Sequence, residues 1–325
     1  MRIHPEYPAT VLLLAVGCLR AQPPMPAAPS KPDTPEIKAM IENIRKSAGP
    51  MWQYAVHFWC EEPRANTPTD PVIPPTKIFD NVWAIGNIGT AVYVIQTSDG
   101  LLMIDSLDAN QVETQLLPGF QKAGLDPAKV KAIVVAHGHA DHFGGTRYFQ
   151  EHFGSRIYIS GADWNMMENP TAAQKKGPPV PLPKHDAELK DGEPVVVGDF
   201  KITPYAIPGH TPGAMGFIFT VKDNGKTHTA ALFGGTWLLP RFLSDEAMQT
   251  FLKSLAHWRE VTKEAKVDVS LMNHPLMDPL QNKLDALASR KSGGPNPFVV
   301  GQANYQKFLG VAQGCSEVDV ARRKL

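Results

Sequence analysis

The sequence predicts an α+β fold in which two mixed β-sheets pack together and helices cover their outer faces. Strand patterns occur in two groups along the 325-residue chain, and helical patterns follow each group. A cluster of polar residues, His137-Gly138-His139-Ala140-Asp141-His142, comes directly after an apolar strand pattern. Open α/β sheets place their chemistry at this end of a strand. We expect one domain over residues 77–325 with its site at this cluster.

The N-terminus has the pattern of an export signal. Residues 11–19 form a short apolar run with Arg2 before it and Arg20 after it. The run is too short to span a bilayer and is typical of a secretory signal. We expect residues 1–21 to be a signal peptide, the protein to be periplasmic or secreted, and no other segment to span a membrane. Cys18 ends a sequence similar to a lipoprotein cleavage box, so a lipid anchor there stays open.

Residues 22–76 are expected to form a Pro-rich linker and an aromatic N-terminal extension. Residues 36–47 have helical spacing, and residues 51–60 include four aromatic side chains. We expect the extension to pack over the domain or over the mouth of its site. Cys60 and Cys315 remain after removal of the leader, and export permits a disulfide between them. The sequence does not indicate whether they meet.

The first group of elements leads to the polar cluster. Alternating or β-branched apolar residues separated by Gly-containing turns predict strands at 78–85, 90–97 and 101–105. Helical spacing follows at 108–122. The apolar run 130–136 then predicts a buried strand that ends at the cluster, followed by a helix at 146–153 and a strand at 156–160.

The second group begins after a Pro-rich loop at 169–185, whose length is typical of a functional or covering segment. Strands are predicted at 194–197, 200–206, 215–221 and 227–233. An amphipathic helix at 245–264, a strand at 267–272 and helices at 280–290 and 302–315 complete the chain.

The charge balance excludes some partners. Lys plus Arg and Asp plus Glu both number 32, so the formal net charge is zero. The sequence contains no cluster of basic residues of the kind that would predict nucleic-acid binding. We expect a small-molecule substrate and no nucleic-acid partner, and the sequence leaves the oligomeric state open.

The cluster has the residue types of a transition-metal site. Three imidazoles and a carboxylate suit zinc, and iron or manganese less well. The four side chains are too closely spaced to serve one ion from a single helix or strand. A tight loop can direct His137 and His139 one way and Asp141 and His142 the other, which predicts two neighbouring metal positions.

Further ligands are expected at the ends of later strands. His210 lies in Pro208-Gly209-His210-Thr211-Pro212-Gly213, after a predicted strand, and His274 follows the strand predicted at 267–272. The alternative for each is a histidine in a solvent-exposed turn. His57, His152, His185, His228 and His257 have no comparable setting, and we expect them to be surface or structural residues.

These three motifs, in this order, resemble the metallo-β-lactamase superfamily from about residue 77 to 313. The resemblance implies an αββα sandwich with two Zn²⁺ at one edge of the sheets. It implies that one zinc is held by His137, His139 and His210, and the other by Asp141, His142 and His274. Asp105 is similar to the family's buried aspartate that supports the metal loop.

Within that family the chain most resembles subclass B3. Many other relatives place a bridging aspartate after the strand that ends here near Gly235, whereas this chain has Gly235-Thr236 and no carboxylate nearby. Subclass B3 enzymes commonly have serines near Thr236 and Leu238 that help to place the substrate carboxylate. We expect Thr236 to retain one such hydroxyl, and Trp237 and Leu238 to make the pocket more apolar.

The resemblance implies a zinc-dependent hydrolase associated with antibiotic resistance. Zinc lowers the pKa of a bound water from 15.7 to roughly 7, which supplies hydroxide at neutral pH. We expect this zinc-bound hydroxide to open the β-lactam amide, with Asp141 as the catalytic residue that orients the nucleophile or accepts its proton. A secreted lactonase or esterase on the same scaffold is the first alternative. A catalytically inactive metal-binding protein is the second.

Overall fold

The computed structural model describes residues 32–62, 67, 69–170, 179–235, 243–278 and 280–324. All of these residues except Pro32 belong to one compact unit, Asp33–Leu325. The predicted signal peptide, Cys18 and Thr236 lie outside the described residues. Among the described residues, no helix has both the length and the apolar character that a bilayer span requires.

The first sheet has seven strands in the order of the chain. They are β1 (Thr76–Phe79), β2 (Val82–Gly86), β3 (Ala91–Thr97), β4 (Gly100–Ile104), β5 (Val130–Val134), β6 (Arg156–Ser160) and β7 (Ala187–Leu189). The first four strands pair antiparallel, and β4 to β7 pair parallel. The sheet is therefore mixed, as predicted.

The second sheet has five strands in the order β12-β11-β10-β9-β8. They are β8 (Val195–Val197), β9 (Phe200–Ala206), β10 (Met215–Asp223), β11 (Lys226–Phe233) and β12 (Val269–Met272). Only the pairing of β11 with β12 is parallel. In that pairing Phe233 lies opposite Met272, so both strands end at the same edge of the sheet.

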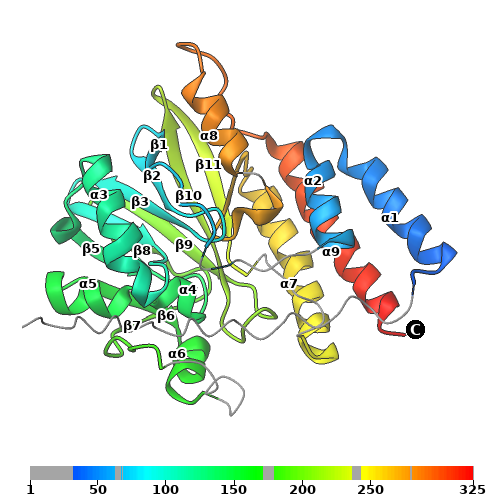
Figure 1. The fold of residues 1–325 in the computed structure, drawn as a ribbon, viewed down its shortest axis with the longest axis horizontal. Coiled ribbons are helices and arrows are strands. Elements are labelled where there is room, and N and C mark those ends of the chain that lie inside the picture. The colour runs from blue at the N-terminus through cyan, green and yellow to red at the C-terminus, as the bar shows by residue number, and fades with distance from the viewer. Residues whose placement is uncertain are drawn as a thin grey trace, which may run out of the picture. The chain divides into compact units, whose positions relative to one another are not determined.

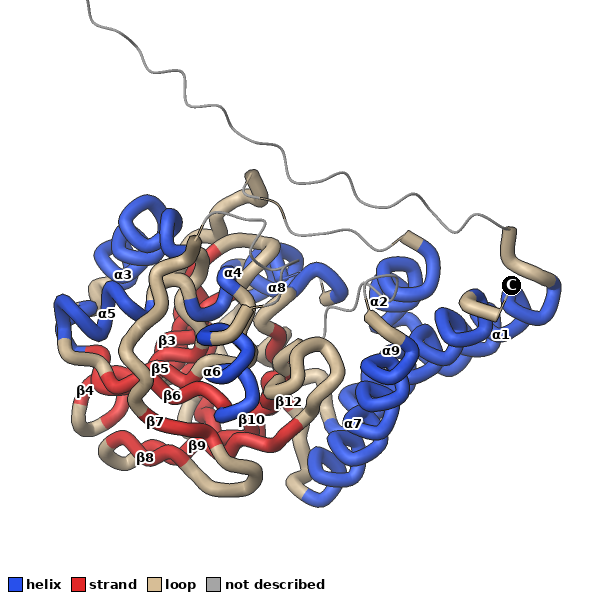
Figure 2. The backbone as a smooth tube through the Cα atoms, turned by 90° about the horizontal axis from the view of Figure 1, so that it is seen from below, coloured by secondary structure: helices blue, strands red, loops and turns tan. Residues whose placement is uncertain are grey.

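The two sheets pack face to face, and helices cover their outer faces. Tyr93 and Val134 of the first sheet lie in one apolar core with Phe217 and Leu232 of the second. Figure 2 shows the strands between α3 and α5 on one side and α7 and α9 on the other. The predicted αββα sandwich is thus confirmed.

The helices of the first half are α3 (Leu117–Ala123), α4 (Ala140–Phe143), α5 (Thr146–Phe153) and α6 (Gly161–Glu168), with helical turns η3 (Ala109–Gln111), η4 (Val112–Leu116) and η5 (Pro127–Lys129). Those of the second half are α7 (Asp245–Glu264), α8 (Leu280–Ala288) and α9 (Gln302–Arg322), with the turn η8 (Pro275–Met277).

The structure differs from the sequence predictions at several places, and α9 ends at Arg322 where the prediction ended at 315. The strand predicted at 78–85 is the hairpin β1–β2, because Asp80 and Asn81 form a turn there. The helix predicted at 108–122 is divided into η3, η4 and α3, since Pro118 lacks the N–H that a continuous helix needs at that position. Helix α6 and strand β7 were not predicted.

The N-terminal extension consists of α1 (Pro35–Ala48), η1 (Pro50–Trp52), α2 (Gln53–Val56) and η2 (His57–Glu61). Figure 1 shows α1 and α2 beside α9, and both contact that helix. The rings of Trp52 and Trp59 lie 4.8 and 5.2 Å from that of Phe308. Cys60 and Cys315 form a disulfide. The extension is therefore tied to the C-terminal helix covalently as well as by apolar packing.

Candidate metal centre

The predicted ligands lie in loops at one edge of the two sheets. His137 and His139 follow β5, and Asp141 and His142 belong to α4 directly after them. His210 lies between β9 and β10, and His274 follows β12. Two backbone hydrogen bonds join the sheets here, from Met215 N–H to the Ala136 carbonyl and from Ala91 N–H to the Asn273 carbonyl, both 2.8 Å long.

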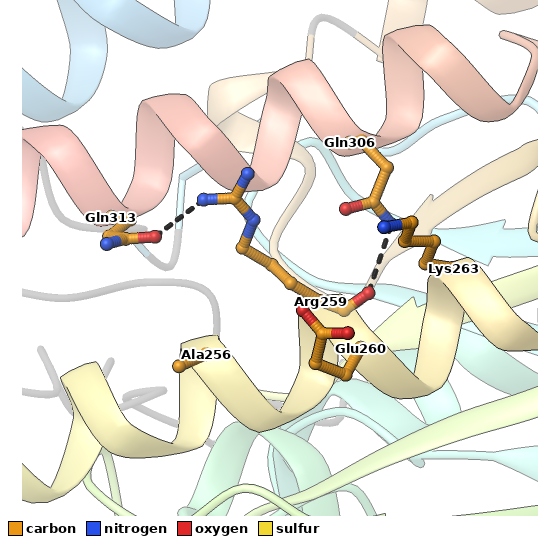
Figure 3. Close-up of a pocket in the computed structure, with 6 residues that line it drawn as sticks. All are labelled: Ala256, Arg259, Glu260, Lys263, Gln306 and Gln313. Atoms are coloured by element: carbon orange, nitrogen blue, oxygen red, sulfur yellow. Dashed lines mark hydrogen bonds between the residues drawn. The ribbon is translucent and has the colours of Figure 1, made fainter.

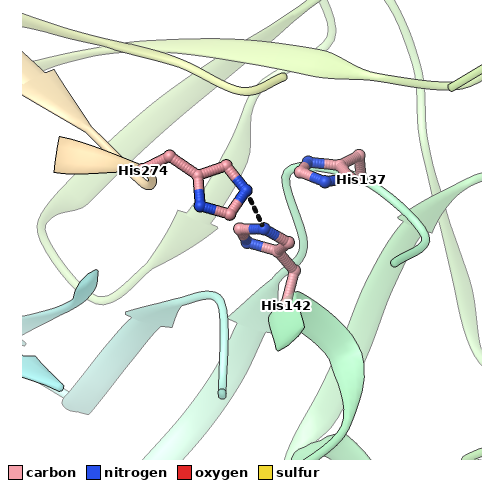
Figure 4. A group of neighbouring side chains, drawn as sticks. All are labelled: His137, His142 and His274. Carbon is pink, nitrogen blue, oxygen red and sulfur yellow. Dashed lines mark hydrogen bonds between the residues drawn. The ribbon is translucent and has the colours of Figure 1, made fainter. Parts of the chain in front are cut away.

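The five histidine rings converge into one cluster. The Nε2 atoms of His142 and His274 are 2.9 Å apart, and those of His137 and His210 are 3.1 Å apart. The rings of His139 and His210 are 4.7 Å apart between centroids. His137, His142 and His274 form one group with potential ligand atoms within 4.8 Å of one another, and His137, His139 and His210 form a second. Figure 4 shows the first group converging from separate segments.

Asp141 completes the cluster. Its Oδ2 lies 3.3 Å from Nε2 of His142 and 3.6 Å from Nε2 of His274. The hydroxyl of Thr90 donates to the same oxygen at 3.3 Å. The structure therefore brings all six predicted ligands into one site, with Asp141, His142 and His274 on one side of it.

The donor set fits zinc. In a tetrahedral site with Zn–N bonds of 2.0–2.1 Å, two ligand nitrogens lie roughly 3.3 Å apart. The facing nitrogen pairs at 2.9 and 3.1 Å are close to this spacing. A buried pair of facing imidazole nitrogens needs a proton or a cation between them, and this site has two such pairs.

Burial favours the neutral form of most of these rings. It lowers the pKa of His137 and His210 well below the ordinary value, and neighbouring histidines lower it further. Burial also lowers the pKa of His274 to about 4. Because neutral imidazole is the form that ligates a metal, these three side chains are prepared for binding at neutral pH.

Hydrogen bonds select which ring nitrogen faces the site. His274 Nδ1 donates to the carbonyl of Gly89 at 2.8 Å, which leaves Nε2 free of a proton. His142 Nδ1 donates to Oδ2 of Asp105 at 2.7 Å, and the other carboxylate oxygen accepts the N–H of Ala136 at 2.8 Å. Asp105 is fully buried and has a φ of 62°. Its placement agrees with the supporting position that the sequence suggested.

His142 differs from the other rings. Burial by itself would lower its pKa, but the carboxylates of Asp141 and Asp105 outweigh that effect and raise the pKa to about 10. Burial likewise opposes ionisation of Asp141, whereas His142 and His274 hold its pKa well below the usual value. Without a metal the Asp141–His142 pair is thus an ion pair, and Asp141 is a carboxylate.

Gly235 lies against the side chain of His210. Its φ is 88°, and a Cβ placed there would lie 2.9 Å from Cβ of His210. Residues 232–235 contain no carboxylate. The predicted substrate-binding residue Thr236 follows immediately but lies outside the described residues.

Sequence reasoning missed Asp163, a fully buried carboxylate in the first turn of α6. It accepts hydrogen bonds from both loops that contain His139 and His210. The available signal was Ser160, an N-cap residue three positions before it and the last residue of the strand predicted at 156–160.

A hollow with a volume of about 410 Å³ lies between α7 and α9. Figure 3 shows its lining, in which Arg259 donates to Gln313 at 2.6 Å and Gln306 donates to the Arg259 carbonyl at 3.3 Å. Glu260 and Lys263 also line it, but no histidine or cysteine does. The histidine cluster is therefore the better candidate for a reactive site.

The family profile described as the Metallo-beta-lactamase superfamily matches residues 85–223, which include five of the six predicted ligands. Over this segment the chain is similar to the metallo-β-lactamase superfamily, as the sequence motifs suggested. His274 lies beyond the matched range, and the structure brings it to the other five.

The structure is similar to that of BJP-1, a subclass B3 metallo-β-lactamase of Bradyrhizobium japonicum. The TM-score is 0.67 and the identity 28%, over 79% of this chain and 95% of that one. Native FEZ-1 metallo-β-lactamase from Legionella gormanii has a TM-score of 0.62 and 23% identity over 79% and 95% of the two chains, a similarity of fold.

Among curated proteins, the hydroxyacylglutathione hydrolase GloC of Haemophilus influenzae is 35% identical over 114 residues, 33% of this chain. The match spans about half of that relative, 52% of its length. The family and these relatives together support a hydrolase.

Proposed function

We propose that the protein is a zinc-dependent hydrolase that opens the amide of β-lactams, as subclass B3 enzymes do. The observation that supports this most directly is the convergence of five histidines and Asp141 at one edge of the two sheets. The 28% identity with BJP-1 over most of both chains supports the substrate class.

The six ligands divide into two sets in this proposal. His137, His139 and His210 would hold the first zinc, and Asp141, His142 and His274 would hold the second. The close approach of the ligand atoms of His137, His139 and His210 supports the first set. The distances of 3.3 and 3.6 Å from Asp141 to His142 and His274 support the second. The lack of a carboxylate at residues 232–235 supports an arrangement without a bridging protein ligand.

Zinc bound at this site supplies a Lewis acid and lowers the pKa of water to roughly 7. The protein's own residues position the reacting groups. Asp141 is held as a carboxylate and can orient the attacking water and accept its proton. Thr90 fixes one of its oxygens by a hydrogen bond. Asp105 and the Gly89 carbonyl hold His142 and His274 in the tautomers that ligate through Nε2.

Thr236 is the proposed contact for the substrate carboxylate, on the strength of its place directly after Gly235. We also propose a periplasmic or secreted location. The apolar run at 11–19 and the disulfide between Cys60 and Cys315 support it, because structural disulfides persist in oxidising compartments.

Hydrolysis of an ester or thioester is the second candidate function. The match to hydroxyacylglutathione hydrolase GloC specifically favours it, since the 35% identity exceeds that with BJP-1, although over a shorter segment. A dinuclear zinc site can serve either reaction, because both proceed through attack of a water on a polarised carbonyl.

Assays with two different substrates distinguish the two proposed functions. The zinc-loaded protein should hydrolyse a chromogenic cephalosporin, EDTA should abolish the turnover, and added zinc should restore it. His257→Ala, which removes an exposed histidine of α7, should retain wild-type turnover as a matched control. Hydrolysis of a hydroxyacylglutathione thioester but not of the cephalosporin would replace the first function by the second.

A further inference from the structure

Asp163 lies between the two loops that hold the proposed ligands of the first zinc. Its Oδ2 accepts the backbone N–H of Gly138 at 2.7 Å and the hydroxyl of Thr211 at 2.8 Å. Its Oδ1 accepts the backbone N–H of Gly213 at 2.8 Å. Gly138 separates His137 from His139, and Thr211 directly follows His210. The carboxylate of Asp163 is therefore hydrogen-bonded both to the backbone between His137 and His139 and to the loop that contains His210.

Two glycines make this approach possible. A Cβ on Gly213 would lie 1.9 Å from the Ser160 hydroxyl and 2.8 Å from Cγ of Asp163. A Cβ on Gly138 would lie 2.9 Å from the end of Met166 and 3.1 Å from Cβ of Asp163. At Gly213 any other residue would collide with Ser160 and with the backbone of Asp163, so its loop would move away from the carboxylate. At Gly138 a Cβ would displace the end of Met166 and press tightly on Asp163.

Helix α6 holds the carboxylate in place. The hydroxyl of Ser160 caps the helix by accepting the N–H of Asp163 at 3.2 Å. The buried Trp164 donates from its ring to the carbonyl of Ala187 in β7 at 3.1 Å. The helix is thus fixed to the edge of the first sheet, and Asp163 connects the His210 loop to that edge.

We propose that Asp163 is a positioning residue that sets the separation of His139 and His210 and so determines the affinity of the first zinc site. This inference rests on the proposed zinc centre. A carboxylate fits the role because its two oxygens accept all three hydrogen bonds, whereas the amide of asparagine would turn an N–H group toward one of the loops. Helix capping alone does not explain the arrangement, because Ser160 already provides the cap.

The test measures zinc affinity at one site, without reference to turnover. In a His274→Ala background, which lacks one ligand of the second site, zinc binding to the remaining site is measured by competition with a chromophoric chelator. Asp163→Asn should weaken this binding roughly 10–100-fold, as loss of a supporting partner of a metal ligand does. Thr211→Val, which removes one bond and leaves α6 intact, should weaken it roughly 3–10-fold. Thr211→Ser should restore it.

Asp268→Asn is the matched control. That carboxylate also bonds a side chain and a backbone N–H, His228 at 2.7 Å and Thr229 at 3.0 Å, but touches neither metal loop. It should leave zinc affinity unchanged. If Asp163→Asn does not fold, the zinc affinities of Thr211→Val and Thr211→Ser are compared instead, and that comparison tests the inference.

Unchanged zinc affinity in Asp163→Asn, or equal affinities of the two Thr211 variants, would overturn the inference. A protein that binds two zinc ions but fails to hydrolyse β-lactams would overturn the proposed substrate and leave this inference standing. A wild-type protein that binds no zinc would overturn both.

Discussion

Asp105→Asn should weaken the second zinc site while leaving the fold intact. In the wild type, one carboxylate oxygen accepts Ala136 N–H and the other accepts Nδ1–H of His142. An asparagine has one oxygen, so its amide group must face one of these two donors. If the oxygen keeps Ala136, the amide N–H faces His142 Nδ1, and the ring proton moves to Nε2. That nitrogen is the proposed metal ligand.

The size of the effect follows from the bond that is lost. At 2.7 Å between fully buried groups, the Asp105–His142 hydrogen bond is charge-assisted. Such a bond contributes about 1.5–3 kcal/mol, which corresponds to roughly 10–150-fold in affinity for the second zinc. Asparagine tolerates the left-handed backbone at this position, where φ is 62°, so backbone strain adds little.

The assay is a two-step zinc titration against a chelator on wild type and variant. Asp268→Asn is again the control, because Asp268 bonds His228 Nδ1 and a backbone N–H in the same pattern without a metal nearby. A second zinc that binds Asp105→Asn as tightly as wild type would refute the tautomer argument. Equal weakening by Asp268→Asn would show a general loss of stability instead.

Three further outcomes are expected. His274→Ala should lose the second zinc by metal analysis and lower turnover by roughly 100-fold or more, because a ligand is removed outright; a fully active two-zinc variant would contradict the assignment. Replacing Cys60 and Cys315 by serine should lower the free energy of unfolding by about 2–5 kcal/mol in urea titrations, since the disulfide closes a long loop, and an unchanged midpoint would contradict this. Burial raises the pKa of Asp319 to about 6, so its contribution to stability is present below about pH 4 and is lost as the pH rises through 6. Asp319→Asn should therefore be more stable than wild type above pH 7, by about 1–2 kcal/mol in the free energy of unfolding, measured by thermal or urea unfolding. A variant that is equally stable or less stable than wild type above pH 7 would contradict this.

The sequence predicted the long elements well because their apolar spacing is regular. Helix α7 has the predicted limits, and strands β3, β4 and β9 begin or end within one residue of prediction. The limits of α3 were wrong because Pro118 divides a segment whose side-chain spacing is helical throughout. Strand β7 has three residues and follows a Pro-rich segment, so it provides too short a pattern to detect.

The site was predictable where ligand chemistry is concentrated in a short motif. The six ligands stand out because histidines follow strand ends, and the fold brings strand ends together. Asp163 has no such signal, since an acidic residue in the first turn of a helix is common on energetic grounds alone. The pairing of Cys60 with Cys315 depends on how α9 packs against the extension, which sequence spacing does not encode.

Zinc stoichiometry of the wild-type protein tests the central claim most directly. Metal analysis of the protein after zinc loading and removal of free metal should give two zinc ions per chain. The proposed division of the six ligands requires that number, with three ligands for each ion. One weakly held zinc, or none, would contradict the proposed dinuclear centre.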